Sequence, residues 1–450
     1  MTFRAPMLAV SLCALGCAST SPAPAFHDTS QLIKARIGKR LAWNQGGPED
    51  AAVAKTVREL LAHELSVDGA VQVALLNNRA LLATYEDLSV AQADLVQAGL
   101  LQNPVFGGAI VVPVAGVAQR GGSVSVSQDF LSVFTLAARK RVATAELEAA
   151  KLRVADSVLR TAYDVETAFF MLQSAQQVAA MRRTVLEAGD AALDLARLQR
   201  QAGNVSDLDV ASQQVLYEQV RTDLVRSEAD VVTARESLAR GMGVWGPDAD
   251  YRVAEKLPEL PPDDAAAPHL EALAIGRRLD LGAARAEAQA ASYALAMARN
   301  YRLLGTTSLG AGFERSPEGF SVAGPSASLE LPIFDQRQAV VARLEAQTRA
   351  AIARESALAV DIRSEVRAAH GRLVAARAIV ERYAKVVVPL RQRVVALTQQ
   401  QYDAMLLGAY QLLQVKQSEV NAYRELIEAL RDYWTARAEL ERATGGSLPS

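Results

Sequence analysis

Asn78-Arg79-Ala80-Leu81-Leu82-Ala83 and Arg278-Leu279-Asp280-Leu281-Gly282-Ala283 open two similar helical patterns in this 450-residue chain. Apolar positions recur between them at a constant offset: Leu81, Ala83, Ala91, Leu95 and Ala98 match Leu281, Ala283, Ala291, Leu295 and Ala298. Each copy continues into a short β-hairpin pattern and then into a very long helical pattern. This order predicts a duplicated structural unit, and one copy is too small to close its own sheet.

The composition is that of a folded protein built on long helices. Apolar residues make up 50% of the chain and charged residues 22%. The formal net charge is −2, so the charge balance gives no indication of a nucleic-acid partner. Aromatic residues are only 5%, while Ala, Leu, Arg, Glu and Gln dominate the two longest helical tracts. This predicts helices packed as in coiled coils.

The N-terminus carries a secretory signal pattern over residues 1–16. Arg4 precedes an apolar run from Met7 to Leu12, and small residues follow. The segment Ala14-Leu15-Gly16-Cys17 resembles a bacterial lipoprotein signal, which predicts that Cys17 becomes an acylated N-terminus. The alternative is ordinary signal cleavage nearby, with Cys17 removed or left free. Residues 17–65 are then expected to form a tether and a periplasmic segment.

The first repeat is predicted to span residues 66–242. A helical tract runs from Ser66 to Leu101, with an interruption expected at Asn77-Asn78, and Asn103-Pro104 ends it. A hairpin follows over about 105–134. Within it, Ser123-Val124-Ser125-Val126-Ser127-Gln128 alternates polar and apolar side chains, which is typical of a strand with one wetted face.

A single rod-like helix is predicted over residues 136–202, because the tract has no proline and Gly189 is its only glycine. Such a helix would be about 100 Å long at 1.5 Å per residue. Val158, Val165 and Phe169 belong to an apolar stripe with coiled-coil spacing. Charges lie on most turns, and no uncharged run has the roughly 18 apolar residues that a membrane span needs. The rod is therefore expected to stand in water, packed against other helices.

Gly203-Asn204-Val205-Ser206 turns the chain back at the end of this rod. Gly and Asn suit a helix C-terminus, and Ser206 with Asp209 three residues later resembles a capping box. The returning helix, about 207–242, is roughly half as long as the rod, as is the helical tract of 66–101. Two half-length helices stacked end to end would match one rod.

The second repeat, 268–444, follows a proline-containing linker at 243–267 and precedes a tail at 445–450. Its predicted parts are a helix at about 268–302, a hairpin at about 305–334, a rod at 337–406 and a final helix at 411–444. Pro389 lies inside the second rod and is expected to kink or divide it.

The strands have two explanations. Six of the ten phenylalanines lie in or beside the two hairpin windows, as in the interfacial aromatic girdles of a membrane β-barrel. Four strands are too few for such a barrel, and an open sheet edge cannot exist in lipid, so closure requires several copies of the chain. The alternative is a pair of soluble hairpins that cap a helical bundle. The secretory signal favours the membrane explanation.

Taken in order, several segments resemble the TolC-like outer membrane efflux proteins, over roughly residues 65–445. These segments are Asn103-Pro104, the turn Gly203 to Asp209, Arg278-Leu279-Asp280-Leu281, Leu331-Pro332-Ile333-Phe334-Asp335, and Gly408-Ala409-Tyr410-Gln411-Leu412-Leu413. The resemblance implies a mainly α fold with a small membrane β part. Three chains would close a 12-stranded β-barrel in the bacterial outer membrane and a 12-helix periplasmic tunnel. The implied partners are a periplasmic adaptor (membrane fusion protein) and an inner-membrane pump.

The same resemblance assigns roles to the two turns. The positions that match the periplasmic tips, where adaptor hairpins dock and the tunnel closes, are Gly203, Asn204, Val205, Ser206, Asp207, Leu407, Gly408, Ala409 and Tyr410. Asp209 stands where family members often place a gate-forming aspartate, and helix capping is its alternative role. Counted from Gly408, the matching positions are Gln414 and Gln417, where the best-known member has aspartates. Amides there could close a gate by hydrogen bonds, or simply face solvent.

No catalytic or cofactor motif is found, so we expect a channel without enzymatic activity, cofactor or metal site. Gly241-Met242-Gly243-Val244-Trp245-Gly246 spells GxGxxG, but it follows a helix instead of a strand and is interpreted as a helix end. The four histidines lack zinc-site spacing. The tip Leu406 to Leu413 resembles the metal-resistance branch, which favours heavy-metal ions as cargo. The alternatives are drug efflux, type I protein secretion, and a periplasmic coiled-coil scaffold or adaptor without channel activity.

Overall fold

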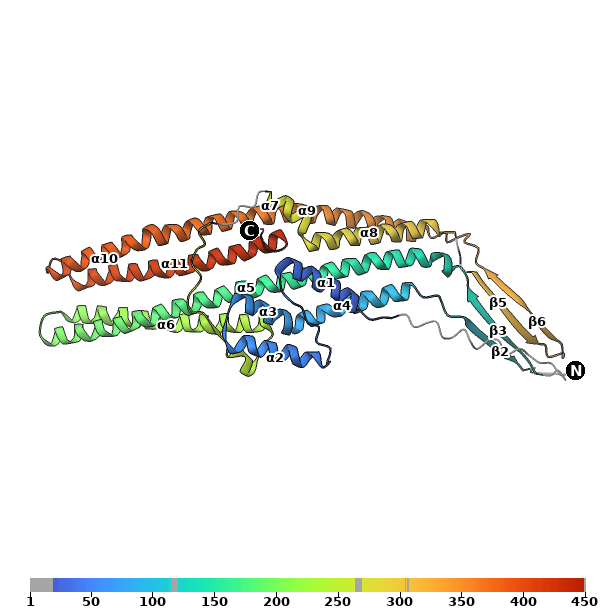
Figure 1. Ribbon diagram of the computed structural model, residues 1–450, viewed down its shortest axis with the longest axis horizontal. Coiled ribbons are helices and arrows are strands. Elements are labelled where there is room, and N and C mark those ends of the chain that lie inside the picture. The colour runs from blue at the N-terminus through green and yellow to red at the C-terminus, as the bar shows by residue number, and fades with distance from the viewer. Residues whose placement is uncertain are drawn as a thin grey trace. The chain divides into compact units, whose positions relative to one another are not determined.

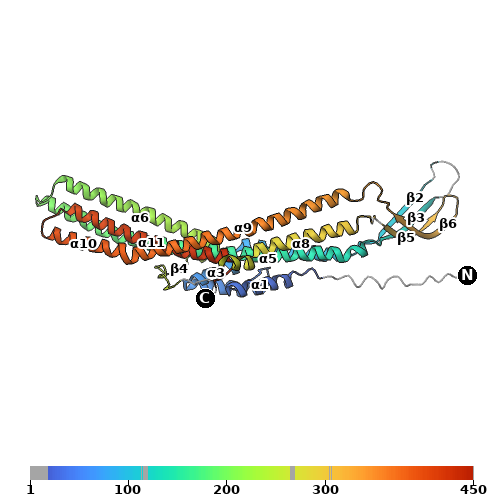
Figure 2. The same ribbon diagram turned by 90° about the horizontal axis from the view of Figure 1, so that it is seen from above.

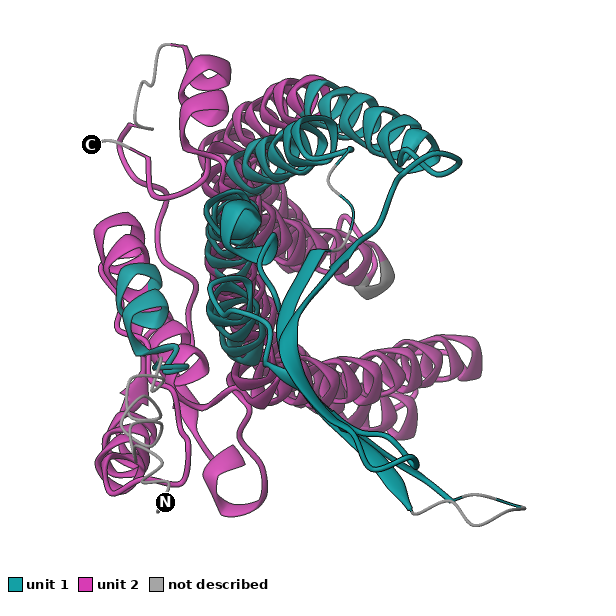
Figure 3. Ribbon diagram, turned by 90° about the vertical axis from the view of Figure 1, so that its right-hand side faces the viewer, with its two compact units in different colours: residues 1–29, 85–154, 280–358 teal, residues 30–84, 155–279, 359–450 magenta. Residues whose placement is uncertain are grey.

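The computed structural model of the chain describes residues 19–112, 114, 120–263, 269–303, 305 and 307–448. The expected signal segment, 1–16, and Cys17 lie outside these residues. The chain divides into two compact units, coloured separately in Figure 3. Unit 1 comprises Met1–Thr29, Tyr85–Val154 and Asp280–Leu358, and unit 2 comprises Ser30–Thr84, Ala155–Leu279 and Ala359–Ser450.

Long helices dominate the chain, and four strands form its main sheet (Figures 1 and 2). In chain order the elements are α1 (Ala23–Ile37), α2 (Glu49–Ala62), β1 (Glu64–Leu65), α3 (Val67–Asn77), α4 (Arg79–Ala98), β2 (Val105–Val111), β3 (Gly121–Asp129), α5 (Ser132–Gln201), α6 (Asp207–Met242), η1 (Gly246–Ala249), β4 (Arg252–Val253), α7 (Leu270–Arg277), α8 (Leu279–Asn300), β5 (Thr307–Arg315), β6 (Ser321–Leu329), α9 (Gln338–Arg382), η2 (Tyr383–Val387), α10 (Val388–Asp403) and α11 (Ala409–Thr444).

Unit 1 holds the four-stranded antiparallel sheet, in the order β2-β3-β5-β6. The two predicted hairpins are confirmed, and β3 pairs with β5, so the two repeats share one sheet. The register places Val126 opposite Ala311. Gly310 is required by this close pairing, because a Cβ atom there would collide with the carbonyl oxygen of Val126.

Parts of α8 and α9 in unit 1 are joined by ion pairs on their exposed surfaces. Arg285 lies 3.2 Å from Glu355, and Arg299 lies 2.5 Å from Glu345. Surface pairs of this kind contribute little to stability.

Unit 2 contains the first of two similar helix junctions. The interruption expected at Asn77-Asn78 is confirmed between α3 and α4. The Asn77 amide donates to the carbonyl oxygen of Gly243 at 2.8 Å, and the Asn78 amide donates to that of Gly241 at 2.8 Å. The two asparagines therefore satisfy free carbonyls at the C-terminus of α6. Gly243 ends α6 in the left-handed conformation, with φ of 70°, which confirms the interpretation of the GxGxxG stretch as a helix end.

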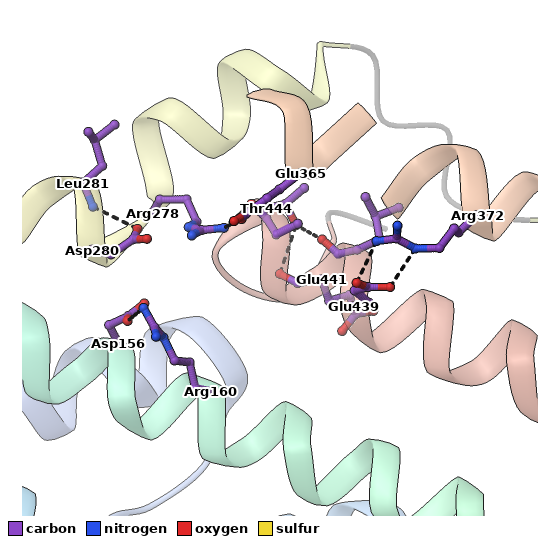
Figure 4. Close-up of polar contacts among 12 residues, drawn as sticks. Asp156, Arg160, Arg278, Asp280, Leu281, Glu365, Arg372, Glu439, Glu441 and Thr444 are labelled. Atoms are coloured by element: carbon purple, nitrogen blue, oxygen red, sulfur yellow. Dashed lines mark hydrogen bonds and ion pairs between the residues drawn. The ribbon is translucent and has the colours of Figure 1, made fainter. Parts of the chain in front are cut away.

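The second junction repeats this arrangement with different chemistry. Gly445 ends α11 with φ of 80°, and a Cβ atom on it would lie 3.0 Å from the carbonyl oxygen of Arg277. Arg278 separates α7 from α8, and its guanidinium lies 2.7 Å from Glu365 (Figure 4). The same guanidinium donates to the Ala443 carbonyl oxygen at 3.4 Å. The single helix predicted over 268–302 is therefore wrong, because this tertiary contact breaks it at Arg278.

The two rods differ at Pro389. The first rod, α5, is one helix of 70 residues. Its predicted apolar stripe is buried, with Val158, Val165 and Phe169 at most 3% exposed. The second rod is divided as predicted, since a π-helical turn, η2, separates α9 from α10 just before Pro389. Proline has no N–H to donate, and the wider turn accommodates its ring.

The N-terminal segment 17–65 and the linker are more structured than the sequence pattern indicated. The segment forms α1 and α2, which were not predicted, and β1 pairs in parallel with β4 of the linker. A side chain of the second rod holds the linker. Arg377 of α9 donates to the carbonyl oxygens of Pro261 and Pro262 at 2.8 Å and 2.6 Å.

Across the part of the chain that the structure describes, no helix carries an apolar stretch long enough to cross a membrane.

Candidate functional site

The first turn joins α5 to α6 through two linked caps. Gly203 has φ of 80°, and its N–H and that of Asn204 donate to the carbonyl oxygens of Arg200 and Gln199 at 3.0 Å and 2.9 Å. This is the pattern of a Schellman motif. Ser206 then starts α6, and the predicted capping box is confirmed. The Ser206 hydroxyl accepts from the Asp209 N–H at 3.2 Å, and the Asp209 carboxylate accepts from the Ser206 N–H at 2.9 Å.

Charged side chains surround this turn. The guanidinium of Arg200 donates two hydrogen bonds to the Asp207 carboxylate, at 2.6 Å and 2.9 Å. This pairing lowers the pKa of Asp207 and raises that of Arg200. The hydrogen bonds from Ser206 lower the pKa of Asp209. Both aspartates are therefore charged at neutral pH, next to the N-terminus of α6, where the helix dipole favours negative charge.

The second turn repeats the backbone of the first with different residues. The N–H groups of Met405 and Leu406 donate to the carbonyl oxygens of Tyr402 and Gln401, both at 2.9 Å, and Met405 has φ of 59°. Met405 thus occupies the left-handed position that Gly203 holds in the first turn. Gly408 is the N-cap of α11 and offers no side-chain cap.

This backbone match changes which positions correspond between the turns. Because Gly408 and Ser206 are both N-caps, the counterpart of Asp209 is Gln411, three residues after Gly408. The correspondence of Asp209 with Gln414, counted from the glycines, was wrong. Only the observed N-caps identify Gln411, because the final helix was predicted to begin at Gln411 and begins at Ala409.

The two turns lie on a shared cavity in unit 2, with a volume of about 730 Å³. Its lining residues are Ala192, Leu195, Ala196, Gln199, Val205, Leu208, Asp209, Ser212, Gln213, Tyr402, Gly408, Leu412, Leu413 and Lys416. Most of the lining is apolar, and Asp209 and Lys416 bring opposite charges to it. Sequence reasoning missed Lys416, because it lies in a helical pattern with no motif.

The remaining predicted residues lie around this cavity. Gln414 is exposed and does not line it. Gln417 is half-buried and donates to the Asn421 side chain at 3.5 Å. Ala409 and Tyr410 begin α11, and their side chains lie outside the described part of the structure.

Large apolar side chains are exposed at both turns. Leu208 is 75% exposed, and Met405 and Leu406 are 93% and 73% exposed. Exposed apolar surface concentrated at the ends of charged helices is typical of a protein interaction surface.

The four-stranded sheet is strongly two-sided. The register and the alternation of side chains along each strand place one set of apolar residues on a single face: Phe106, Ile110, Val124, Val126, Leu309, Ala311, Phe313, Ala323, Pro325, Ala327 and Leu329. The opposite face carries mainly serine and glycine: Gly107, Ser123, Ser125, Ser127, Ser308, Gly310, Gly312, Ser326 and Ser328. Val105, Ala109, Val111 and Val322 are apolar exceptions on this second face. Phe106 and Ile110 on the apolar face are 70% and 81% exposed.

Among the described residues, no group of three or more His, Cys, Asp or Glu side chains has the geometry to hold a metal ion.

Comparison with known proteins gives a family match over part of the chain and a shared fold. Residues 70–244 match the sequence model of the outer membrane efflux protein family. A search of curated proteins found no match. Among solved structures, a membrane protein from Pseudomonas aeruginosa is similar with a TM-score of 0.74 and 20% identity, over 84% of this chain and 92% of that one.

Two further structures share the fold. CusC matches with a TM-score of 0.71 and 16% identity, over 85% of this chain and 92% of its own. The Campylobacter jejuni CmeC outer membrane channel matches with a TM-score of 0.70 and 15% identity, over 84% and 85% of the two chains. The predicted fold class, mainly helical with a small β part and two repeats, is confirmed.

Proposed function

We propose that the chain is the outer membrane channel of a tripartite efflux system, because residues 70–244 match the sequence model of the outer membrane efflux protein family. Three copies would close a 12-stranded barrel in the outer membrane and a 12-helix tunnel in the periplasm. The channel would passively conduct cargo delivered by an inner-membrane pump and a periplasmic adaptor. A lipid on Cys17 would add an anchor in the same membrane.

The two-sided sheet is the observation that carries this proposal. Its apolar face would meet lipid, and its serine and glycine face would line a water-filled lumen. Within the described residues β2 and β6 each pair on one side only. Unpaired edges are too costly in lipid, so β6 of one copy would pair with β2 of the next. A soluble scaffold is not expected to expose an apolar face of this kind to water.

The two turns support the periplasmic part of the proposal. Their exposed Leu208, Met405 and Leu406 would dock an adaptor. Asp209 lines the cavity that the turns share. In the proposed trimer three copies of Asp209 would form a ring at the tunnel entrance and concentrate negative charge there. We propose Asp209 as a gate residue in addition to its capping role. Gln414 and Gln417 remain gate candidates that would act by hydrogen bonds.

Native mass spectrometry of the full chain, extracted from outer membranes in mild detergent, tests the assembly. The proposal expects a trimer that conducts ions in planar bilayers. A monomer recovered from the soluble periplasmic fraction would contradict it.

For cargo, we propose heavy-metal ions, on the likeness of the Leu406 to Leu413 tip to the metal-resistance branch. Deletion of the gene should then sensitise cells to copper, silver, cobalt, zinc or cadmium. Unchanged metal tolerance with lost dye or antibiotic efflux would instead favour drug export, and loss of a secreted protein would favour type I secretion.

A further inference from the structure

Unit 2 contains a second cavity that the turns do not explain. Its volume is about 540 Å³, within the usual range for small-molecule sites. Residues of α5, α11, the β1–α3 segment, the segment after α1 and the linker line it. The lining residues used below are Tyr163, Glu166, Phe169, Phe170 and Gln173 of α5, with Trp434, Arg437 and Glu441 of α11, and Lys39, Glu64 and Asp68.

The walls of this cavity are held in place by hydrogen bonds and ring contacts. The Gln173 amide donates to the carbonyl oxygens of Ala254 and Lys256 at 3.1 Å and 3.2 Å. The Trp434 indole donates to the Pro258 carbonyl oxygen at 3.0 Å, and its ring stacks on Phe170 with centroids 5.4 Å apart. The linker is thus fixed to both α5 and α11, so the cavity has a defined shape.

Two deeply buried polar atoms in the lining have no partner among the described residues. They are the hydroxyl of Tyr163, a residue 4% exposed, and the carbonyl oxygen Oε1 of Gln173, a residue 2% exposed. The orientation of the Gln173 amide is fixed, because its nitrogen faces two carbonyl oxygens. Buried polar groups are nearly always hydrogen-bonded, so these two call for a donor. Tyr163, Glu166 and Gln173 lie three and seven residues apart on one face of α5.

The charges around the cavity are unbalanced. Lys39 pairs with Asp68, and the guanidinium of Arg437 lies 3.5 Å from Glu441. Half-buried Glu166 has no ion pair or hydrogen bond within the described residues. Burial, followed by repulsion from Glu441, raises the pKa of Glu166 to about 7, with Asp68 acting in the same direction and Arg437 and Lys39 opposing it. Glu64, at the rim, adds a further carboxylate.

We propose that this cavity binds a small organic ammonium ion with an apolar body. A primary ammonium has three N–H donors, which match the Glu166 carboxylate, the Tyr163 hydroxyl and the Gln173 carbonyl oxygen. The apolar body packs against Phe169 and Phe170. The excess of carboxylates excludes anions, and the unpartnered acceptors discriminate against ligands without donors. This binding does not depend on the channel function proposed above.

Isothermal titration calorimetry of the full chain in detergent tests the site, with phenethylammonium as the probe and the near-isosteric 2-phenylethanol as its neutral match. The ammonium should bind and the alcohol should bind at least about tenfold more weakly, because a charge-assisted hydrogen bond is lost. Glu166→Gln should weaken phenethylammonium binding by about tenfold or more. Asp164→Asn, an exposed neighbour on α5 that does not line this cavity, should leave it unchanged.

The pH dependence provides a test that needs no variant. Binding requires ionised Glu166, so with its pKa at about 7 the affinity should be roughly eightfold to tenfold higher at pH 8 than at pH 6. Any one of three results would overturn the proposal. These are equal binding of the ammonium and the alcohol, an unchanged affinity of Glu166→Gln for phenethylammonium, and absence of any binding. If Glu166→Gln does not fold, a binding affinity of the unmodified protein that does not change between pH 6 and pH 8 would also overturn the proposal.

Discussion

Replacing Gly243 by alanine should test the helix junction of the first repeat, which has a counterpart at Gly445 in the second repeat. Gly243 has φ of 70°, a conformation that costs other residues about 1–2 kcal/mol. The added Cβ would also lie 2.9 Å from the Asn77 carbonyl oxygen and 2.9 Å from the Asn78 Cα. Both are backbone atoms that cannot rotate away, and such overpacking costs about 1–3 kcal/mol. Gly243→Ala should therefore lower the free energy of unfolding by about 2–5 kcal/mol.

Gly203→Ala is the matched control. Gly203 has φ of 80°, but no atom lies within 4 Å of its Cβ position, so only the conformational cost of about 1–2 kcal/mol applies. Gly445→Ala, at the second junction, should resemble Gly243→Ala, because its Cβ would lie 3.0 Å from the Arg277 carbonyl oxygen. Denaturant unfolding in detergent, followed by circular dichroism, gives the comparison. A cost for Gly243→Ala no larger than that for Gly203→Ala would refute the close contact at the junction.

Two further predictions concern carboxylates. Asp209→Ala should raise single-channel conductance in planar bilayers, whereas Ser206→Ala, which removes the cap but keeps the charge, should not; no difference between them would place the gate elsewhere. Because the pKa of Glu166 is raised from 4.5 to about 7 in the folded chain, its contribution to stability is present below pH 4.5 and is lost as the pH rises through 7. The unfolding temperature of the unmodified protein should thus fall more between pH 5 and pH 8 than that of Glu166→Gln, with Asp164→Asn behaving as the unmodified protein; equal falls would contradict the raised pKa.

Local signals in the sequence were sufficient for most of the helices and for the four strands of the main sheet. The capping box at Ser206 and the division before Pro389 depend on residues close together in the chain, and both were predicted. The break at Arg278 depends on Glu365 and Gly445, which are distant in sequence. Arg278 is not a helix-stop residue, but the repeat carried a signal for this break, because Arg278 matches Asn78, where an interruption was expected.

The candidate sites also divide into features that have a local sequence signal and features that depend on residues distant in the chain. The two turns were found from glycine and capping residues, but the correct counterpart of Asp209, Gln411, emerged only from the matched N-caps. The cavity around Glu166 has no sequence motif at all. Tyr163 and Gln173 have the spacing of an ordinary helix face, and only the packing of α11 and the linker shows that they surround a space.

The most direct test of the account is whether the two faces of β3 meet different solvents. Single cysteines at positions 123–127, in a Cys17→Ser background, would carry nitroxide labels in protein reconstituted into liposomes. Labels at Val124 and Val126 should be relaxed by oxygen dissolved in lipid, and labels at Ser123, Ser125 and Ser127 by a water-soluble nickel complex. Uniform access of the nickel complex to all five positions would contradict a membrane channel.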